Sequence, residues 1–412
     1  MKLDVRALGT FNRLAHEGAE QAAASLGALT AVEPRVETTA INLVSRADAG
    51  EVFANSEFVG VQIGFGGGMA GESVLAIDRD GARRLLSSLP GGDADDLTES
   101  RVMEVGNILI GGFLDGWADH LGTAIDFTTP RYVEGTGSDV LPEGAPRWED
   151  HDQVFAFASQ LEASDEAVEL MIYLLPELED FERLVGGPRA GGGVPIPFEE
   201  LSVFNHMTKA GAASASEHVT AMTGMDTTVE VSDLSFVPVE SIASWAGSEA
   251  QIGVTIEFHG LPSGYVVILF DESSAQLLAD QVAPAPVLGD GFGEMQRSAI
   301  KEIANVMTSG FVDGWANVLG TTIDITPPKF THDDGQSIMD PIATRIGRTQ
   351  EFAFVIDSAI VTTDQQIGCN IFALPNEREL ARALNALSVD PSDVDVGDPN
   401  PVPGMDARYE DI

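Results

Sequence analysis

Two places in this chain carry a serine, a glutamate and an asparagine at the same spacing, each followed by a proline. The first set comprises Ser100, Glu104, Asn107 and, after a further twenty-two residues, Pro130. The second set comprises Ser298, Glu302, Asn305 and, after the same interval, Pro328. Because helix positions three and four apart share one face, each set would present a carboxylate beside an amide.

The chemistry open to such a pair is limited. An amide is a poor acid or base, so classical acid–base catalysis is not indicated. The asparagine can hold a water molecule, because its side chain both donates and accepts hydrogen bonds. The glutamate can pair with a cation. An exposed pair could therefore reach into another protein's active site and orient a water there, which in ideal cases lowers a barrier by roughly 7–11 kcal/mol.

A glutamate and an asparagine on a helix are, taken once, usually solvated surface. Here the same spacing occurs twice within a longer duplication, which favours a function. Asp115-Gly116-Trp117-Ala118 recurs as Asp313-Gly314-Trp315-Ala316, and the two tryptophans are expected to anchor the core. A period of nearly two hundred residues indicates tandem domains and not a solenoid.

The predicted organisation is a first domain over 1–187, a Gly/Pro linker over 188–197, a second domain over 198–389 and an acidic, disordered tail over 390–412. Each half repeats one order of elements: a first helix, alternating strands, a short helix capped by an aspartate, the motif helix, two strands and a last helix. The expected first helices lie at 5–29 and 201–223, the caps at Asp78 and Asp271, and the motif helices near 97–121 and 294–319. This order predicts α+β domains, each a mostly antiparallel sheet packed with long helices.

Small residues follow the polar face of each motif helix, at Gly111-Gly112 and Ser309-Gly310. They would let another surface approach the helix closely.

The composition limits the partners. The chain has 65 acidic and 22 basic residues and a formal net charge of −43, and only four of the basic residues are lysines. This charge repels phosphate backbones and argues against nucleic acid. The acidic residues are spread over both halves, which favours adaptation to a salt-rich, halophilic cytoplasm over one acidic binding face, because molar salt screens repulsion to roughly 3 Å.

No apolar run is long enough for a transmembrane helix, and the charged start Met1–Arg6 lacks the apolar segment of a signal peptide. We therefore expect a cytoplasmic protein without membrane insertion. The single cysteine, Cys369, is expected to be buried packing material on a strand. The histidines show no metal-ligand spacing, so no metal site is predicted.

At the two motifs the chain resembles the CheC-type family of chemotaxis phosphatases, whose relatives include CheX and the middle domain of the flagellar switch protein FliM. The family motif is Asp/Ser-x3-Glu-x2-Asn-x22-Pro, and both copies match every position. The resemblance implies two consecutive CheC-like domains that insert a Glu and an Asn into the receiver site of phosphorylated CheY. There the Glu engages the receiver's lysine and the Asn orients the water that attacks the aspartyl phosphate.

By this resemblance the catalytic residues are Glu104, Asn107, Glu302 and Asn305, supported by the motif residues Ser100, Pro130, Ser298 and Pro328. The resemblance places the Mg²⁺ of the reaction in the receiver, so this chain is expected to bind no cofactor itself.

A typical family member carries a second Glu-x2-Asn on its first helix, just before a Gly-Ala stretch. Alignment on Gly18-Ala19 puts Arg13 and His16 at those positions in the first half, and alignment on Gly211-Ala212 puts His206 and Lys209 there in the second. Neither pair can reproduce the chemistry, so one intact site per domain is expected.

The leading hypothesis is a phosphatase for a CheY-type response regulator. The alternative is a non-catalytic CheC-like adaptor that binds CheY or a CheD-type receptor deamidase. A flagellar switch component like FliM is less favoured, because no separate CheY-binding peptide is visible at the ends.

Overall fold

The computed structural model describes residues 2–3, 5–29, 34–45, 57–89, 98–142, 153–163, 168–185, 196–282, 292–362 and 366–387. The predicted tail at 390–412 and residues 188–195 of the predicted linker lie outside these ranges. The last two linker positions instead form strand β9 (Ile196–Pro197), which pairs with β1 (Lys2–Leu3).

The first half contains α1 (Val5–Leu29), β2 (Arg35–Ser45), β3 (Phe58–Gly67), β4 (Gly71–Asp78), α2 (Arg79–Ser88), α3 (Glu99–Leu121), β5 (Ile125–Phe127), β6 (Arg131–Gly135), η2 (Gly137–Val140), β7 (Gln153–Ala163), β8 (Val168–Pro176) and α4 (Leu178–Val185). The predicted cap of the short helix is confirmed, since the Asp78 carboxylate accepts a hydrogen bond from the Gly81 amide at 2.8 Å.

The second half contains α5 (Phe198–Thr223), β10 (Thr227–Pro238), η3 (Val239–Ser241), α6 (Ile242–Trp245), β11 (Ala250–Gly260), β12 (Gly264–Asp271), α7 (Glu272–Val282), α8 (Glu294–Leu319), β13 (Ile323–Ile325), β14 (Lys329–Asp334), α9 (Gly335–Ile346), β15 (Phe352–Thr362), β16 (Gln366–Pro375) and α10 (Glu377–Asn385). Asp271 caps α7 in the same way, accepting from the Ser274 amide at 2.7 Å. Cys369 lies buried on β16, as expected.

Among the described residues, fourteen strands form one sheet that runs through both halves. Its order is β13-β11-β12-β16-β15-β10-β2-β7-β8-β4-β3-β5, with β14 also pairing with β11 and β6 with β3. Every one of these pairs is antiparallel. The structure therefore confirms the α+β class and the antiparallel sheet packed with long helices.

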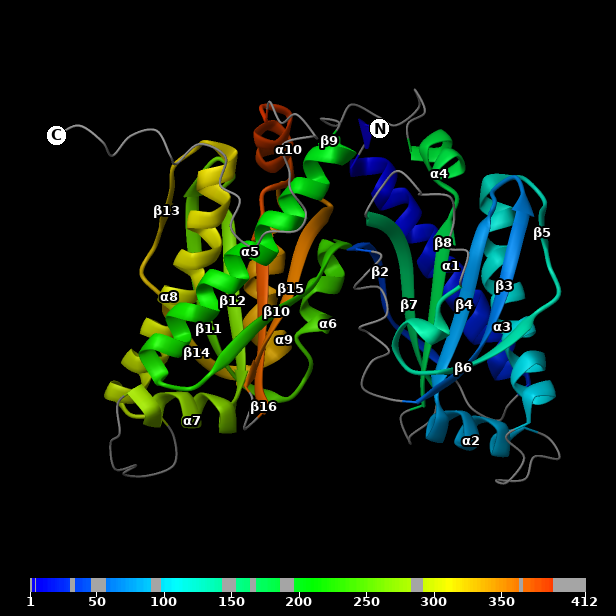
Figure 1. Cartoon of the computed structure of the whole chain (residues 1–412), viewed down its shortest axis with the longest axis horizontal. Helices are drawn as coiled ribbons and strands as arrows, with labels where there is room; N and C mark the ends of the chain where they lie inside the picture. Colours follow the sequence, from blue (N-terminus) through cyan, green and yellow to red (C-terminus); the bar gives the residue numbers. More distant parts are fainter. Residues whose placement is uncertain are drawn as a thin grey trace.

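The halves join where β2 pairs with β10, two strands that the sequence analysis did not predict. Asn42 lies opposite Ser235, which occupies the equivalent position of the second half, 193 residues later. The Ser235 hydroxyl donates a hydrogen bond to the Asn42 side chain at 2.9 Å. Two equivalent asparagines also cross the joint: Asn12 donates to the Phe236 carbonyl at 3.1 Å and Asn205 to the Leu43 carbonyl at 3.3 Å. The joint is a pseudo-twofold seam. Figure 1 shows the same symmetry, with α2 and α7 at the lower edge and α4 and α10 at the upper edge.

In each half the motif helix packs against the first helix. A Cβ on Gly112 would lie 2.9 Å from the Ser25 hydroxyl on α1, and one on Gly310 would lie 3.0 Å from the Ala215 amide nitrogen on α5. The close approach predicted at these small residues is therefore made inside the domain at Gly112 and Gly310. Trp117 and Trp315 are fully buried, which confirms them as core anchors.

The second half has an additional layer. Helices α6 and α9 cover the face of the sheet opposite α5 and α8 and enclose a second hydrophobic core that includes Ile338, Met339 and Ile342. At the corresponding place the described first half has only the short η2 helix. Within the described residues, none of the helices combines the length and apolar character that a bilayer crossing requires.

Candidate functional site

The two motifs lie in the N-terminal halves of α3 and α8. On α3 the residues Val105, Leu109 and Phe113 are buried, and on α8 their counterparts Ile303, Met307 and Phe311 are buried. This apolar stripe attaches each helix to its domain and turns the motif residues away from it. Ser100, Glu104 and Asn107 are exposed, as are Ser298 and Glu302, while Asn305 is half-buried.

The head groups of the motif have no competing partners. Within the described part of the chain, the side chains of Glu104, Asn107, Glu302 and Asn305 make no hydrogen bond and no ion pair. An incoming protein could engage them without breaking an internal contact. Among the described residues, the carboxylates and amides of both halves are thus free of internal contacts.

The motif prolines lie elsewhere, at the strands that follow the helix. Pro130 directly precedes β6 and Pro328 directly precedes β14. Proline suits this position because the sheet edge needs no amide donor there. Each connection also contains a left-handed glycine after the helix, Gly122 with φ 62° and Gly320 with φ 60°. The twenty-two-residue interval thus spans one helix end, one turn and one short strand.

The first-helix residues that the resemblance aligns with a second Glu and Asn make other contacts. Arg13 and His16 are exposed on α1, and the Arg13 guanidinium lies 5.4 Å from the ring centre of Phe352 in the other half. His16 lies 3.7 Å from Glu20 on the same helix. Lys209 is half-buried on α5, and the His206 side chain lies outside the described residues. In the first half, Arg13 thus contacts the other half of the chain.

The motif residues of the two halves are not brought together. Figure 1 shows α3 and α8 on opposite outer sides of the molecule, with the seam between them. Each motif is therefore a separate exposed face on its own helix.

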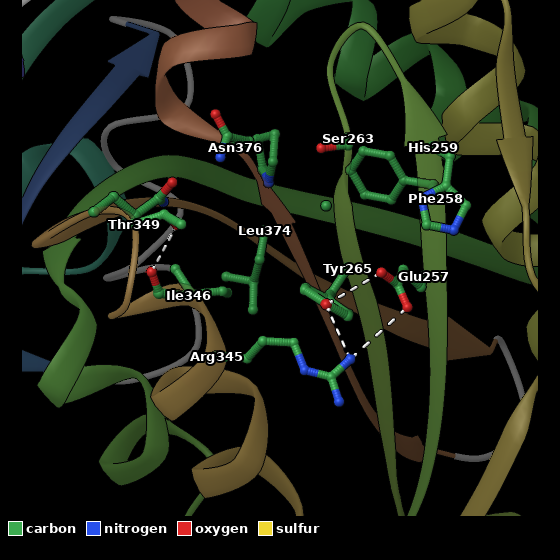
Figure 2. Close-up of a pocket in the computed structure, with 13 residues that line it drawn as sticks. Glu257, Phe258, His259, Ser263, Tyr265, Arg345, Ile346, Thr349, Leu374 and Asn376 are labelled. Carbon is green, nitrogen blue, oxygen red and sulfur yellow. Dashed lines mark hydrogen bonds and ion pairs between the residues drawn. The ribbon is translucent and has the colours of Figure 1, made fainter.

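A small hollow exists in the second half, away from the motif. Its volume is about 180 Å³, and it lies between the β11–β12 hairpin, β16 and the end of α9. Figure 2 shows Arg345 reaching Tyr265 and Glu257 at its edge, with a 3.2 Å hydrogen bond to the tyrosine hydroxyl and a 3.8 Å ion pair to the carboxylate. No motif residue lines this hollow. Among the described residues no group of three or more His, Cys, Asp or Glu side chains could hold a metal ion.

Known proteins match the same regions. Residues 98–134 and 295–332 match the model of the CheC-like family, which covers each motif helix and the chain up to β6 or β14. The chain is also 32% identical over 197 residues to CheC1 of Halobacterium salinarum, whose name makes it a candidate CheY-P phosphatase. That match spans 47% of this chain and 98% of CheC1. This chain belongs to the CheC-like family.

Two solved structures are also similar. FliY of Thermotoga maritima is 18% identical, with a TM-score of 0.38 over 46% of this chain and 96% of that one. A chain of the CheX–CheY complex with BeF3 and Mg²⁺ from Borrelia burgdorferi is 18% identical, with a TM-score of 0.29 over 39% and 96%.

Sequence reasoning located the motif faces but missed the seam and α9. Apolar residues alternate on β10, first at Val229 and Val231 and then at Leu234 and Phe236, and this is a strand signal that could have been found. Nothing in that pattern says that the strand pairs across domains.

Proposed function

We propose that this chain is a phosphatase that removes the aspartyl phosphate of a CheY-type response regulator in chemotaxis signalling. The observation that carries the proposal is the pair of unengaged Glu and Asn side chains on the outer face of each motif helix. Membership of the CheC-like family and the likeness to CheC1 support it.

In the proposed reaction the receiver and this chain share one active site. Glu104 or Glu302 pairs with the receiver's lysine, and Asn107 or Asn305 holds a water in line with the phosphoryl group. The water oxygen bonds to phosphorus while the bond from phosphorus to the aspartate oxygen breaks, which yields inorganic phosphate and a free carboxylate. Mg²⁺ bound by the receiver would offset the negative charge of the phosphoryl group, and this chain contributes no ligand to it.

The contribution of this chain would be orientation. A water held by one amide attacks with less loss of freedom than a water from bulk solvent, which can be worth several kcal/mol, up to roughly 7–11 in ideal cases. Because α3 and α8 lie on opposite outer sides, two receivers could dock at once without meeting. The two sites are then expected to work independently.

A phosphate-release assay tests the proposal. The protein is added to a phosphorylated CheY-type receiver with Mg²⁺ in molar KCl, which screens the self-repulsion of a chain of net charge −43. We expect release faster than receiver autohydrolysis. The double variant Asn107→Ala/Asn305→Ala should lower it to the autohydrolysis rate with an unchanged circular dichroism spectrum, and each single variant should keep about half of the activity, since independent sites add.

The adaptor hypothesis makes a different prediction for the same assay. A protein that binds a CheY-type receiver, or a CheD-type deamidase, without turnover would show no difference between the wild type and the double variant. That outcome would disprove the phosphatase function.

A further inference from the structure

The two proposed sites carry opposite charges on one flank of the motif helix. One residue before each motif serine stands Glu99 in the first half and Arg297 in the second. One turn later, directly before the motif glutamate, stand Met103 and Lys301. Positions four apart lie on one face, so the first flank carries one anion and the second flank two cations.

The first flank continues onto β6 and α2. Arg79, the first residue of α2, lies 3.9 Å from Glu134 and 3.6 Å from Glu57. The Tyr132 hydroxyl donates to Glu134 at 2.8 Å. Burial first, and then the hydrogen bond and charge of Glu134, with a smaller effect of Glu99, raise the pKa of Tyr132 to about 12. Glu99 therefore belongs to the same surface as this group.

The second flank repeats this group with different residue types. Glu272, the first residue of α7, corresponds to Arg79, and His332 on β14 corresponds to Glu134 on β6. The strand pairing supports the second correspondence, because His332 lies opposite Ile252 on β11 and Glu134 lies opposite Val59 on β3. Glu272 and His332 again contact each other. Arg297 joins the group: its Nε donates to the Phe292 carbonyl at 2.8 Å, and its guanidinium lies 5.2 Å from the ring centre of Phe330, the counterpart of Tyr132. A contact was thus kept in place while its residue types changed.

The contacts of Arg297 with Phe292 and Phe330 account for its position, but they do not neutralise its charge or that of Lys301. Like charges at positions i and i+4 destabilise a helix slightly. Lys301 is one of only four lysines in a chain with 65 acidic residues. Within the described residues, neither Arg297 nor Lys301 forms an ion pair. Both charges therefore remain open to a docked protein: Lys301 adjoins Glu302, and Arg297 precedes Glu302 by five residues, a rise of about 7.5 Å.

We propose that the second site selects a receiver with acidic side chains beside its phosphorylation pocket, which pair with Arg297 and Lys301. The first site, with Glu99 and Met103, lacks this preference, so the two sites of one chain serve different receivers. The inference rests on the proposed function, since it assigns partners to those same sites.

Two single-site proteins test this. Asn107→Ala leaves the second site to be measured, and Asn305→Ala leaves the first. The probes are a phosphorylated CheY-type receiver with acidic residues around its pocket, and a form of it in which those residues are replaced by lysine. For the second site we expect KM for the lysine-substituted receiver to be about tenfold higher or more, with kcat unchanged. A tenfold rise is the size of effect expected from the loss of one contacting charge pair. For the first site KM should not rise.

Exchange of the flanks sharpens the test. Arg297→Glu with Lys301→Met should remove the discrimination at the second site, and Glu99→Arg with Met103→Lys should create it at the first. The matched control is Arg378→Glu on α10, an exposed charge reversal at the opposite edge of the molecule, which should change neither KM ratio. In molar KCl only groups in contact still interact, so discrimination that persists there reports direct pairing.

The failures are separable. Binding of both receiver forms loaded with beryllofluoride is measured alongside turnover. Charge-dependent binding without turnover would overturn the phosphatase function and leave the charge preference. Turnover with equal KM for both receiver forms, unaffected by the flank exchange, would overturn the charge preference and leave the phosphatase.

Discussion

The two halves of this chain share a motif helix and a sheet, and they differ in what surrounds them. The second half has α6 and α9 over the far face of its sheet, and the described first half has only η2 there. The ion pair of Arg79 and Glu134 beside the first motif is replaced in the second half by a hydrogen bond between Glu272 and His332. The comparison indicates that duplication preserved the presentation of Glu and Asn, while the neighbouring surfaces diverged.

The largest difference between the halves should appear on loss of the additional core. Met339 on α9 is fully buried, and its counterpart Leu141 is only half-buried. Met339→Ala should therefore cost about 2–5 kcal/mol of unfolding free energy. Leu141→Ala should cost clearly less. Denaturant unfolding of both variants measures this, and equal losses would show that α9 adds no stability of its own.

The seam should respond equally from both sides, because its contacts are related by the pseudo-twofold axis. Asn12→Ala and Asn205→Ala each leave a buried carbonyl across the joint without its donor, at about 1–3 kcal/mol. We expect similar losses for the two variants, and in the double variant easier proteolysis between the halves. A loss from only one side would contradict the symmetry.

The glycines at the helix contact should distinguish the halves again. A Cβ at position 310 meets the backbone of Ala215 at 3.0 to 3.1 Å, which cannot move aside. A Cβ at position 112 meets the Ser25 hydroxyl first, and that side chain can rotate. Gly310→Ala should thus destabilise by roughly 1–3 kcal/mol and Gly112→Ala by less. Thermal unfolding of the two variants, with Gly111→Ala as a control with no neighbour within 4 Å, measures the difference.

The smallest effect is expected at the core tryptophans. The Trp315 indole donates to the Thr208 hydroxyl at 3.2 Å, whereas the Trp117 indole nitrogen is buried without a partner among the residues that the structure describes. Replacement by phenylalanine removes a hydrogen bond at position 315 and an unsatisfied donor at position 117. Trp315→Phe should therefore cost about 1 kcal/mol more than Trp117→Phe. The reverse order would show that the indole of Trp117 has a partner in solution.

Much of the architecture could be read from local patterns. The motif helices, the Asp78 and Asp271 caps and the buried tryptophans were predicted because each depends on residues within one element or its first turn. The two exposed motif faces followed from helical periodicity alone. The boundary near 188–197 was predicted from composition, and its last residues nevertheless pair with the start of the chain in the β1–β9 ladder.

By itself the sequence determined the residue types, their spacing and the side of the helix on which Glu104, Asn107, Glu302 and Asn305 stand, since these depend on the 3.6-residue repeat. Only the tertiary structure decided that β2 pairs with β10 and that Arg13 packs on Phe352. It also decided that Arg79 contacts Glu134 in the first half and that Glu272 contacts His332 at the equivalent place in the second. Such partners lie far apart along the chain, and packing, not local periodicity, selects them.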